Sequence, residues 1–470
     1  MNNSILKYAT LFLFIAFCFL TAESFSQQSM WKSNQDGWVL RKAPGSTKYE
    51  KFFAIGLWNM PGYTINSMEE DPATYRKDAK RYLARTPLYN MSYMTPGKDK
   101  DMHGRVEITG AIEFQETIRQ YLHKIPDFYQ GTDSDYVIRQ YLKKHINDKD
   151  LNDALDSAIT HLIKVNGNVD HIWAPIDEIV TGGSGSGWCF HSVVGEKIKK
   201  LINTHEKSTL VFTDLIGVGR GNSYYFERNY LQNHDSMPAM PPYEVLGKDY
   251  KIRKDYPLHG FFQSYDGKPV YKNEDDDYVN YDLETLKKMF FENIKICSRD
   301  YKGCGDVFGI NAFMDFNKYP ILAGITVDAI KAGIGPDVPV WLFFDGNAYA
   351  KLPEMSTKDF IQDLKCQMYT SIIHGATGVL FWNDRTVLPP DVFNALEPVM
   401  KEMTNNLSII YLKTVKSKFD NDLHYVIKEK DKSHRFIIAS NTSMTETIKL
   451  NIPNVSKKSL KPLEVFISRL

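Results

Sequence analysis

The stretch that decides the fold is Trp173-Ala-Pro-Ile-Asp-Glu-Ile-Val180, a short apolar run that ends abruptly in the adjacent carboxylates Asp177 and Glu178. A flexible tract, Thr181-Gly-Gly-Ser-Gly-Ser-Gly187, follows it, and then Trp188. A buried strand that delivers two acids to a glycine-rich loop is typical of the carboxyl end of an α/β-barrel strand. The stretch therefore predicts an α/β fold with polar chemistry where its strands end.

Short apolar runs like this one recur along the chain and alternate with amphipathic helical segments. We expect strands at residues 52–58, 88–92, 125–129, 171–176, 209–213, 307–313, 338–344 and 377–382. Strand–helix alternation indicates a parallel sheet with helices outside it. Eight such units predict a closed (β/α)8 TIM barrel. An open doubly wound sheet is the alternative, but Gly56-Leu-Trp-Asn-Met-Pro-Gly62 lacks the GxGxxG spacing of a nucleotide turn.

Three segments of the chain do not follow the strand–helix alternation: the N-terminus, a long insertion and the C-terminal part. Residues 1–26 are typical of a secretory signal peptide, with Lys7 before an apolar segment and small residues near Ser26. A lipoprotein signal centred on Cys18 fits less well, because bulky Phe17 precedes the cysteine. We expect a catalytic barrel over 27–405 with a long insertion at about 214–282. Residues 406–470 predict a small antiparallel β-sandwich-like module, with strands expected at 424–428, 435–439, 447–452 and 463–467.

Composition narrows the classes of partner. The chain has 470 residues with 57 Lys+Arg against 57 Asp+Glu, and this balance argues against nucleic acid or an anionic membrane as a partner. No segment after the signal is apolar over a membrane-spanning length. No Cys/His spacing matches a zinc site, so we expect neither a metal nor another cofactor. Cleavage would leave Cys189, Cys297, Cys304 and Cys366, which we expect to be mostly free and buried.

Acids recur just past the expected strand ends. Asp177 and Glu178 follow the fourth strand, and Asp214, Asp315 and Asp345 follow the fifth, sixth and seventh. An aspartate in such a loop often caps the next helix. Their recurrence at one end of a barrel nevertheless predicts a shared pocket. Paired carboxyls beside tryptophans indicate acid/base chemistry on a carbohydrate.

Two further segments carry a family resemblance, which spans about residues 52–385. Phe53-Ala-Ile-Gly-Leu-Trp58 and Ile373-His-Gly-Ala-Thr-Gly-Val-Leu-Phe-Trp382 resemble the first and eighth strands of (β/α)8-barrel glycoside hydrolases. That superfamily places its acid/base after strand four and its nucleophile after strand seven. The resemblance implies a secreted bacterial hydrolase of O-glycosyl bonds acting on an oligo- or polysaccharide. From the predicted signal peptide, we expect export to the periplasm or the extracellular space.

Residue by residue, the resemblance implies Glu178 as proton donor, Asp177 as the neighbour that orients it and Asp345 as the second carboxylate. Trp382 would be the platform on which a sugar ring stacks. The remaining substrate-binding residues would be Trp58, Asn59, Trp188, Asp214, Asp315, Asn383 and Arg385. His374, at a helix end, is interpreted as structural.

The chain departs from the family's pattern at both carboxyl positions, having Asp-Glu where strand four usually offers Asn-Glu and Asp where strand seven usually offers Glu. Asp345 as nucleophile gives retention, with carboxyls about 5 Å apart, and Asp345 holding a water gives inversion at about 6.5–9.5 Å. The Asp177-Glu178 pair is also similar to that of substrate-assisted hexosaminidases. Other barrel clans use an aspartate after strand four as the nucleophile. By that pattern Asp177 would be the nucleophile of this chain, and Asp214 or Asp315 would be the acid. A catalytically inactive glycan-binding barrel is a further alternative. An esterase on the same barrel is disfavoured, because the sequence contains no GxSxG motif.

Overall fold

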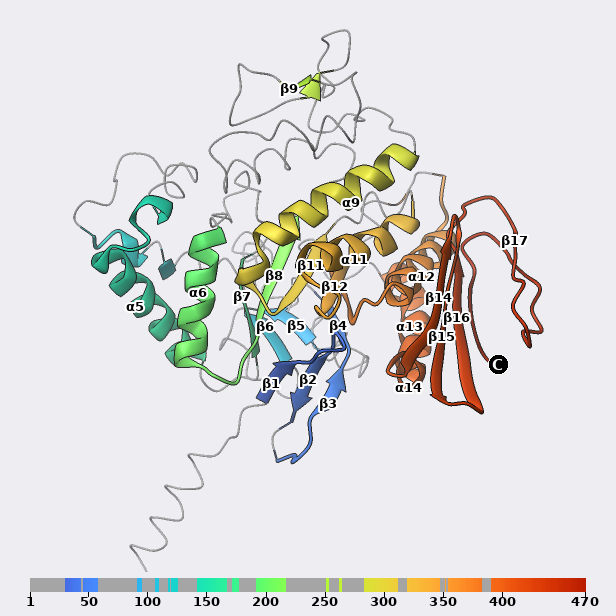
Figure 1. Cartoon of the computed structure of the whole chain (residues 1–470), viewed down its shortest axis with the longest axis horizontal. Coiled ribbons are helices and arrows are strands. Elements are labelled where there is room, and N and C mark those ends of the chain that lie inside the picture. Colours follow the sequence, from blue (N-terminus) through green and yellow to red (C-terminus); the bar gives the residue numbers. More distant parts are fainter. Residues whose placement is uncertain are drawn as a thin grey trace, which may run out of the picture.

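The fold of the chain is taken from a computed structural model (Figure 1). The structure describes residues 30–43, 45–57, 91–94, 106–109, 117–118, 120–125, 142–166, 171–176, 192–216, 251–252, 262–263, 283–311, 319–346, 351, 354–382 and 390–470. The predicted signal peptide and most of the predicted insertion lie outside these residues.

Eight parallel strands close into a barrel in the order β11-β12-β13-β4-β5-β6-β7-β8. They are β4 (Ala54–Leu57), β5 (Met91–Met94), β6 (Val106–Thr109), β7 (His171–Ile176), β8 (Val211–Ile216), β11 (Val307–Asn311), β12 (Val340–Asp345) and β13 (Gly378–Trp382). Chain order therefore makes β7 the fourth strand and β12 the seventh, which confirms the predicted α/β class with a curved parallel sheet. In the described part of the chain, helices follow the last six strands. They are α5 (Lys149–Asn166), α6 (Ser192–His205), α9 (Leu283–Asp300), α11 (Ile321–Ile334), α12 (Thr357–Ile373) and α13 (Pro390–Asn405).

The predicted third strand is wrong, and several other predicted strand ends are shifted by a few residues. The third strand is Val106–Thr109, whereas Ile125 lies in a turn after a short helical segment. Ile118, Leu122 and Ile125 are all buried, and their spacing is that of one helix face rather than of a strand. The fifth strand runs on to Ile216, so the insertion cannot begin at residue 214. Within the insertion, β9 (Lys251–Ile252) pairs with β10 (Phe262–Gln263).

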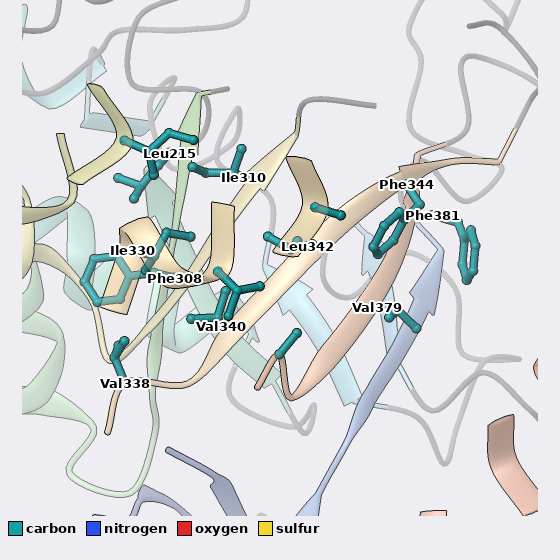
Figure 2. Packing of buried hydrophobic residues seen from close by; sticks show 14 of the residues in the cluster. Leu215, Phe308, Ile310, Ile330, Val338, Val340, Leu342, Phe344, Val379 and Phe381 are labelled. Atoms are coloured by element: carbon teal, nitrogen blue, oxygen red, sulfur yellow. The ribbon is translucent and has the colours of Figure 1, made fainter. Parts of the chain in front are cut away.

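Along the barrel strands whose side chains the structure describes, side chains alternate between two separate cores. One core is the barrel interior, which contains Ala54, Phe212, Trp341 and Phe343 together with other inward positions. The other lies between the strands and the helices. Figure 2 shows part of it, with Val340, Leu342 and Phe344 along β12. Because the side-chain period of a strand is two, residues of one parity face inward along a regular strand, and the bulge between Trp173 and Ile176 of β7 interrupts this alternation.

The amino ends of the barrel strands are covered by a three-stranded antiparallel sheet. Its strands are β1 (Met30–Ser33), β2 (Val39–Lys42) and β3 (Glu50–Phe52). Trp31 and Phe52 from this sheet join the interior core, with their rings 5.1 Å apart and nearly perpendicular. The opposite, carboxyl end of the barrel is therefore the end left for a site.

The motif from Ile373 to Trp382 has a structural explanation for its glycines. His374 ends α12, and Gly375 takes a φ of 97°, a conformation that favours glycine. At Gly378 a Cβ atom would lie 2.4 Å from Cδ1 of Trp341, and at Gly309 one would lie 2.5 Å from Cζ of Phe212. These two glycines leave room for the stacked rings of Phe212 and Trp341, which fill the barrel interior.

The C-terminal part is antiparallel, as predicted, although the strands differ in detail. A four-stranded sheet has the order β14-β15-β16-β19, and a two-stranded sheet pairs β17 with β18 (Figure 1). These strands are β14 (Lys413–Asp420), β15 (Leu423–Asp431), β16 (His434–Asn441), β17 (Ile448–Lys449), β18 (Ser459–Leu460) and β19 (Val465–Arg469). β14 has no counterpart in the prediction, because every one of its residues is exposed and its sequence shows no apolar alternation.

Candidate active site

Asp345 is the predicted carboxylate that the structure describes best. It is the last residue of β12 and is fully buried. Phe343 and Trp341, two and four residues before it, both belong to the interior core, so Asp345 shares their inward parity. The side chain therefore belongs to the interior of the barrel at its carboxyl end.

Trp382 is the cross-strand neighbour of Asp345. The two residues pair in the register between β12 and β13. Neighbouring strands lie about 4.8 Å apart, so the backbone places the predicted second carboxylate and the predicted sugar platform side by side. The fold thus brings together two residues that stand 37 positions apart in the sequence.

Asp214 occupies a different level of the barrel from the one predicted. It is the fourth residue of β8 rather than a residue beyond its end, and it is 1% exposed. Asp214 pairs with Gly309 of β11, and Gly309 pairs in turn with Trp341 of β12. Trp341 stands four residues before Asp345. At about 3.3 Å per strand residue, Asp214 lies well below Asp345 along the ladder. The expectation that Asp214 follows strand five is wrong, because the strand continues through two more apolar residues.

The strand before Asp177 and Glu178 is held on its outer side. The indole Nε1 of Trp173 donates a hydrogen bond of 2.8 Å to Glu206, whose carboxylate also lies 3.2 Å from Nε2 of His171. Burial by itself would raise the pKa of Glu206, but its contacts with His171 and Trp173 outweigh burial and lower that pKa. Ile172 and Ala174 consequently face the barrel interior.

Several predicted site residues lie outside the described residues. They are Trp58, Asn59, Asp177, Glu178, Trp188, Asp315, Asn383 and Arg385. Of the cysteines, Cys297, Cys304 and Cys366 are buried and free, and Cys189 lies outside the described part. Among the residues that the structure covers, no group of three or more His, Cys, Asp and Glu could hold a metal ion. Within the same part of the chain, no helix is both long enough and apolar enough to span a membrane.

One hollow of about 450 Å³ lies away from this site, on the C-terminal sheets. Its lining includes Lys418, Asp420, Tyr425, Glu446 and Asn451. The sequence analysis names no site residue there, because these residues are spread over strands and loops with no motif spacing. Lys418 and Asp420 form an ion pair of 2.9 Å at the hollow.

Comparison with known proteins gives no family assignment from sequence. No family model matches the chain. No curated protein matches it either.

Solved structures give low-identity similarities. The chain is 8% identical to the cyclic α-maltosyl-(1→6)-maltose hydrolase from Arthrobacter globiformis, with a TM-score of 0.42 and coverage of 88% of this chain and 98% of that one. It is 10% identical to an α-amylase from Geobacillus thermoleovorans, with a TM-score of 0.37 and coverage of 89% and 98%. It is 9% identical to xylanase 10B from Thermotoga petrophila, with a TM-score of 0.36 and coverage of 75% and 94%. Because these TM-scores are all below 0.5, the barrel assignment rests on the strand pairing described above.

Proposed function

We propose that the chain is an exported glycoside hydrolase whose site lies at the carboxyl end of the barrel. The observation that carries this proposal is Asp345, a buried carboxylate of inward parity at the end of the seventh strand, beside Trp382. Burying a carboxylate is costly, so a fully buried acid at the end of a barrel strand favours a functional role. The three similar structures are named as a hydrolase, an α-amylase and a xylanase, which is compatible with this function but adds no weight at their TM-scores.

The proton donor in this proposal is Glu178. It stands two residues after Ile176, the last residue of the fourth strand, which is the position that the family resemblance gives to the acid. Asp177 would be the neighbour that orients this acid. Two adjacent carboxyls favour the protonated form of one of them, as a general acid requires.

The reaction would then proceed as in other two-carboxylate glycosidases. Glu178 protonates the glycosidic oxygen as the bond to the anomeric carbon breaks. Asp345 either attacks that carbon or activates a water on its other face. Trp382, Trp58 and Trp188 would stack on sugar rings, and Asn59, Asp315, Asn383 and Arg385 would bond sugar hydroxyls. Asp214 lies deeper in the barrel and would act through the residues above it.

A second candidate is a glycan-binding barrel without hydrolysis. The observation that favours it is the residue type at the end of the seventh strand, where Asp345 is one methylene shorter than the glutamate usual in the resembling family. A carboxylate that reaches less far can still bond a sugar hydroxyl. Binding without turnover on a broad panel would support this candidate.

The test compares Glu178→Gln, Asp345→Asn and Asp177→Asn with the wild type on a panel of oligo- and polysaccharides. We expect the first two variants to lose at least about 100-fold in turnover while still binding the substrate, because each amide keeps the size of the acid but not its chemistry. Asp337→Asn is the control, since Asp337 is exposed and precedes β12 at the other end of the barrel. Unchanged turnover in Glu178→Gln would remove the acid role. Large losses in both Glu178→Gln and Asp177→Asn, with little change in Asp345→Asn, would favour the substrate-assisted mechanism.

A further inference from the structure

A chain of polar groups crosses the contact between the barrel helices and the C-terminal sheet. Oδ2 of Asp328 on α11 lies 2.7 Å from Nδ1 of His374 at the end of α12. Nε2 of His374 lies 2.9 Å from Nδ1 of His424 on β15, and Nε2 of His424 lies 2.8 Å from the backbone oxygen of Asn421. We call these four residues the histidine seam.

The acceptors at the two ends of the seam determine which ring nitrogens donate hydrogen bonds. A backbone carbonyl only accepts, so Nε2 of His424 must carry the proton that it donates to Asn421. Because burial and the neighbouring His374 lower the pKa of His424 to about 3, this ring is neutral and its Nδ1 is an acceptor. His374 must then donate from Nε2 to His424.

The same reasoning assigns the other nitrogen of His374. Nδ1 faces the carboxylate of Asp328, which also only accepts, so this nitrogen must donate as well. An imidazole with two protonated nitrogens is an imidazolium. A neutral ring would direct a lone pair at the carboxylate from 2.7 Å, in a side chain that is only 2% exposed.

The surroundings of His374 suit a cation. His374 is the C-cap of α12, where the helix dipole favours positive charge. Its ring stacks on Phe419 of β14 at 3.9 Å between centroids and an interplanar angle of 19°. On the other side, a Cβ at Gly324 of α11 would lie 2.6 Å from Cδ2 of His374, so only glycine admits the ring there.

Other charged groups reach the seam from the elements packed around it. Lys331 of α11 donates to the backbone oxygen of Gly375, the residue after His374. Lys287 of α9 and Asp420 of β14 act on His424 with opposite signs. Asp328 is the carboxylate in direct contact with His374 in the described part of the chain.

We propose that His374 is an imidazolium that fastens the C-terminal sheet to the barrel, so that this attachment weakens when rising pH removes the proton. The charge is held between Asp328 of the barrel and His424 of the sheet, and its loss breaks the bond to Asp328. The proposal concerns the joint between the two parts and is independent of hydrolysis, because none of these residues belongs to the proposed active site.

Asp328→Asn is the decisive variant. Its side-chain amide can donate to Nδ1 of a neutral His374, and that ring still donates from Nε2 to His424. Every hydrogen bond is therefore retained without any charge. We expect thermal unfolding of wild type to lie about 2–4 °C above that of Asp328→Asn at about pH 6, and the difference to vanish or reverse by about pH 9. Asp337→Asn, with an exposed aspartate just beyond α11, should follow the wild type throughout.

A difference between wild type and Asp328→Asn that is the same at both pH values would overturn the proposal. Ring-¹⁵N histidine spectra provide a second measurement that needs no stable Asp328 variant. With the resonances assigned by their loss in His374→Gln and His424→Gln, we expect His374 at neutral pH to show two protonated nitrogens and His424 one. A neutral His374 in the wild type would equally reject the proposal.

Discussion

The barrel interior and the two histidines of the histidine seam are buried, yet they are held by different forces. In the interior, Phe212, Trp341 and Phe343 pack ring against ring. The indole nitrogen of Trp341 has no hydrogen-bond partner in the described part of the chain. The seam instead depends on directed contacts between ring nitrogens, a carboxylate and a backbone oxygen.

Further polar contacts connect α12 with the C-terminal sheet. Thr370 and Ser440 hydroxyl oxygens are 2.9 Å apart, and Cys366 donates to the backbone oxygen of Asn441. Apolar packing is non-directional and independent of protonation, whereas these contacts exist only in one geometry and one protonation state. The comparison teaches that the barrel is fixed by volume and the attachment of the sheet by donor–acceptor matching. The predictions below, ordered by expected effect, test this difference.

The largest effect is expected in the barrel interior. Trp341→Ala should lower the free energy of unfolding by about 3–5 kcal/mol, because it leaves a large cavity between β11 and β13. Trp341→Phe is the matched variant. It should cost about 1–2 kcal/mol, since most of the ring volume remains and no hydrogen bond is lost. Chemical denaturation followed by circular dichroism measures both. Equal losses would mean that volume does not control this region.

The acid response of the seam comes next. The pKa of His424 is lowered in the folded chain from 6.5 to about 3, so its neutral form stabilises the fold above pH 6.5. This stability is lost progressively as pH falls from about 6.5 toward 3, because the unfolded chain takes up the proton first. At about pH 4.5 the loss should be about 2–3 kcal/mol. In His424→Gln the slope of unfolding free energy against pH should be shallower by about one proton over this range. Identical slopes in the two proteins would contradict the burial of a neutral His424.

A smaller effect is expected at Asn441, at the end of β16. Its fully buried side chain donates to the backbone oxygens of Glu446, Leu460 and Lys461 and accepts from the amide of Ser443.

Asn441→Ala should lower the free energy of unfolding by about 2 kcal/mol. The three backbone oxygens lose their buried donor, and water restores only some of these hydrogen bonds. The exposed Asn451 of the same module provides the control, and Asn451→Ala should be close to neutral. If both variants are neutral, directed bonds do not organise these loops.

The sequence predicted most of the barrel because seven of its strands are apolar runs between helical patterns. His171–Ile176 was predicted to the residue, since its flanks are polar on both sides. The third strand was missed because Val106–Thr109 is short and contains Glu107, while Pro126 and the aromatics near it suggested a strand at 125–129. β14 was missed for a related reason, because an edge strand with no buried residue has no apolar period.

The candidate site was predictable in type more than in position. Asp345 and Trp382 could be chosen because each ends an apolar run, and strand pairing made them neighbours. Asp214 was expected just after the fifth strand but lies within it. Residue type alone does not show at which residue such a strand ends. The seam could not be predicted at all. His374 and His424 are 50 positions apart, and no local pattern marks either as a partner of the other.

The sequence by itself determined the strand–helix alternation, the acids at strand ends and the antiparallel C-terminal part. These follow from hydrophobic period and turn residues, which are local properties. Tertiary structure alone decided which residues share a level of the barrel and placed His374 against both a carboxylate and a second histidine. It also requires glycine at Gly309 and Gly378, where a Cβ atom would clash with a neighbouring ring. Such features depend on contacts between distant segments, and their energies arise only when packing excludes water and fixes donors against acceptors.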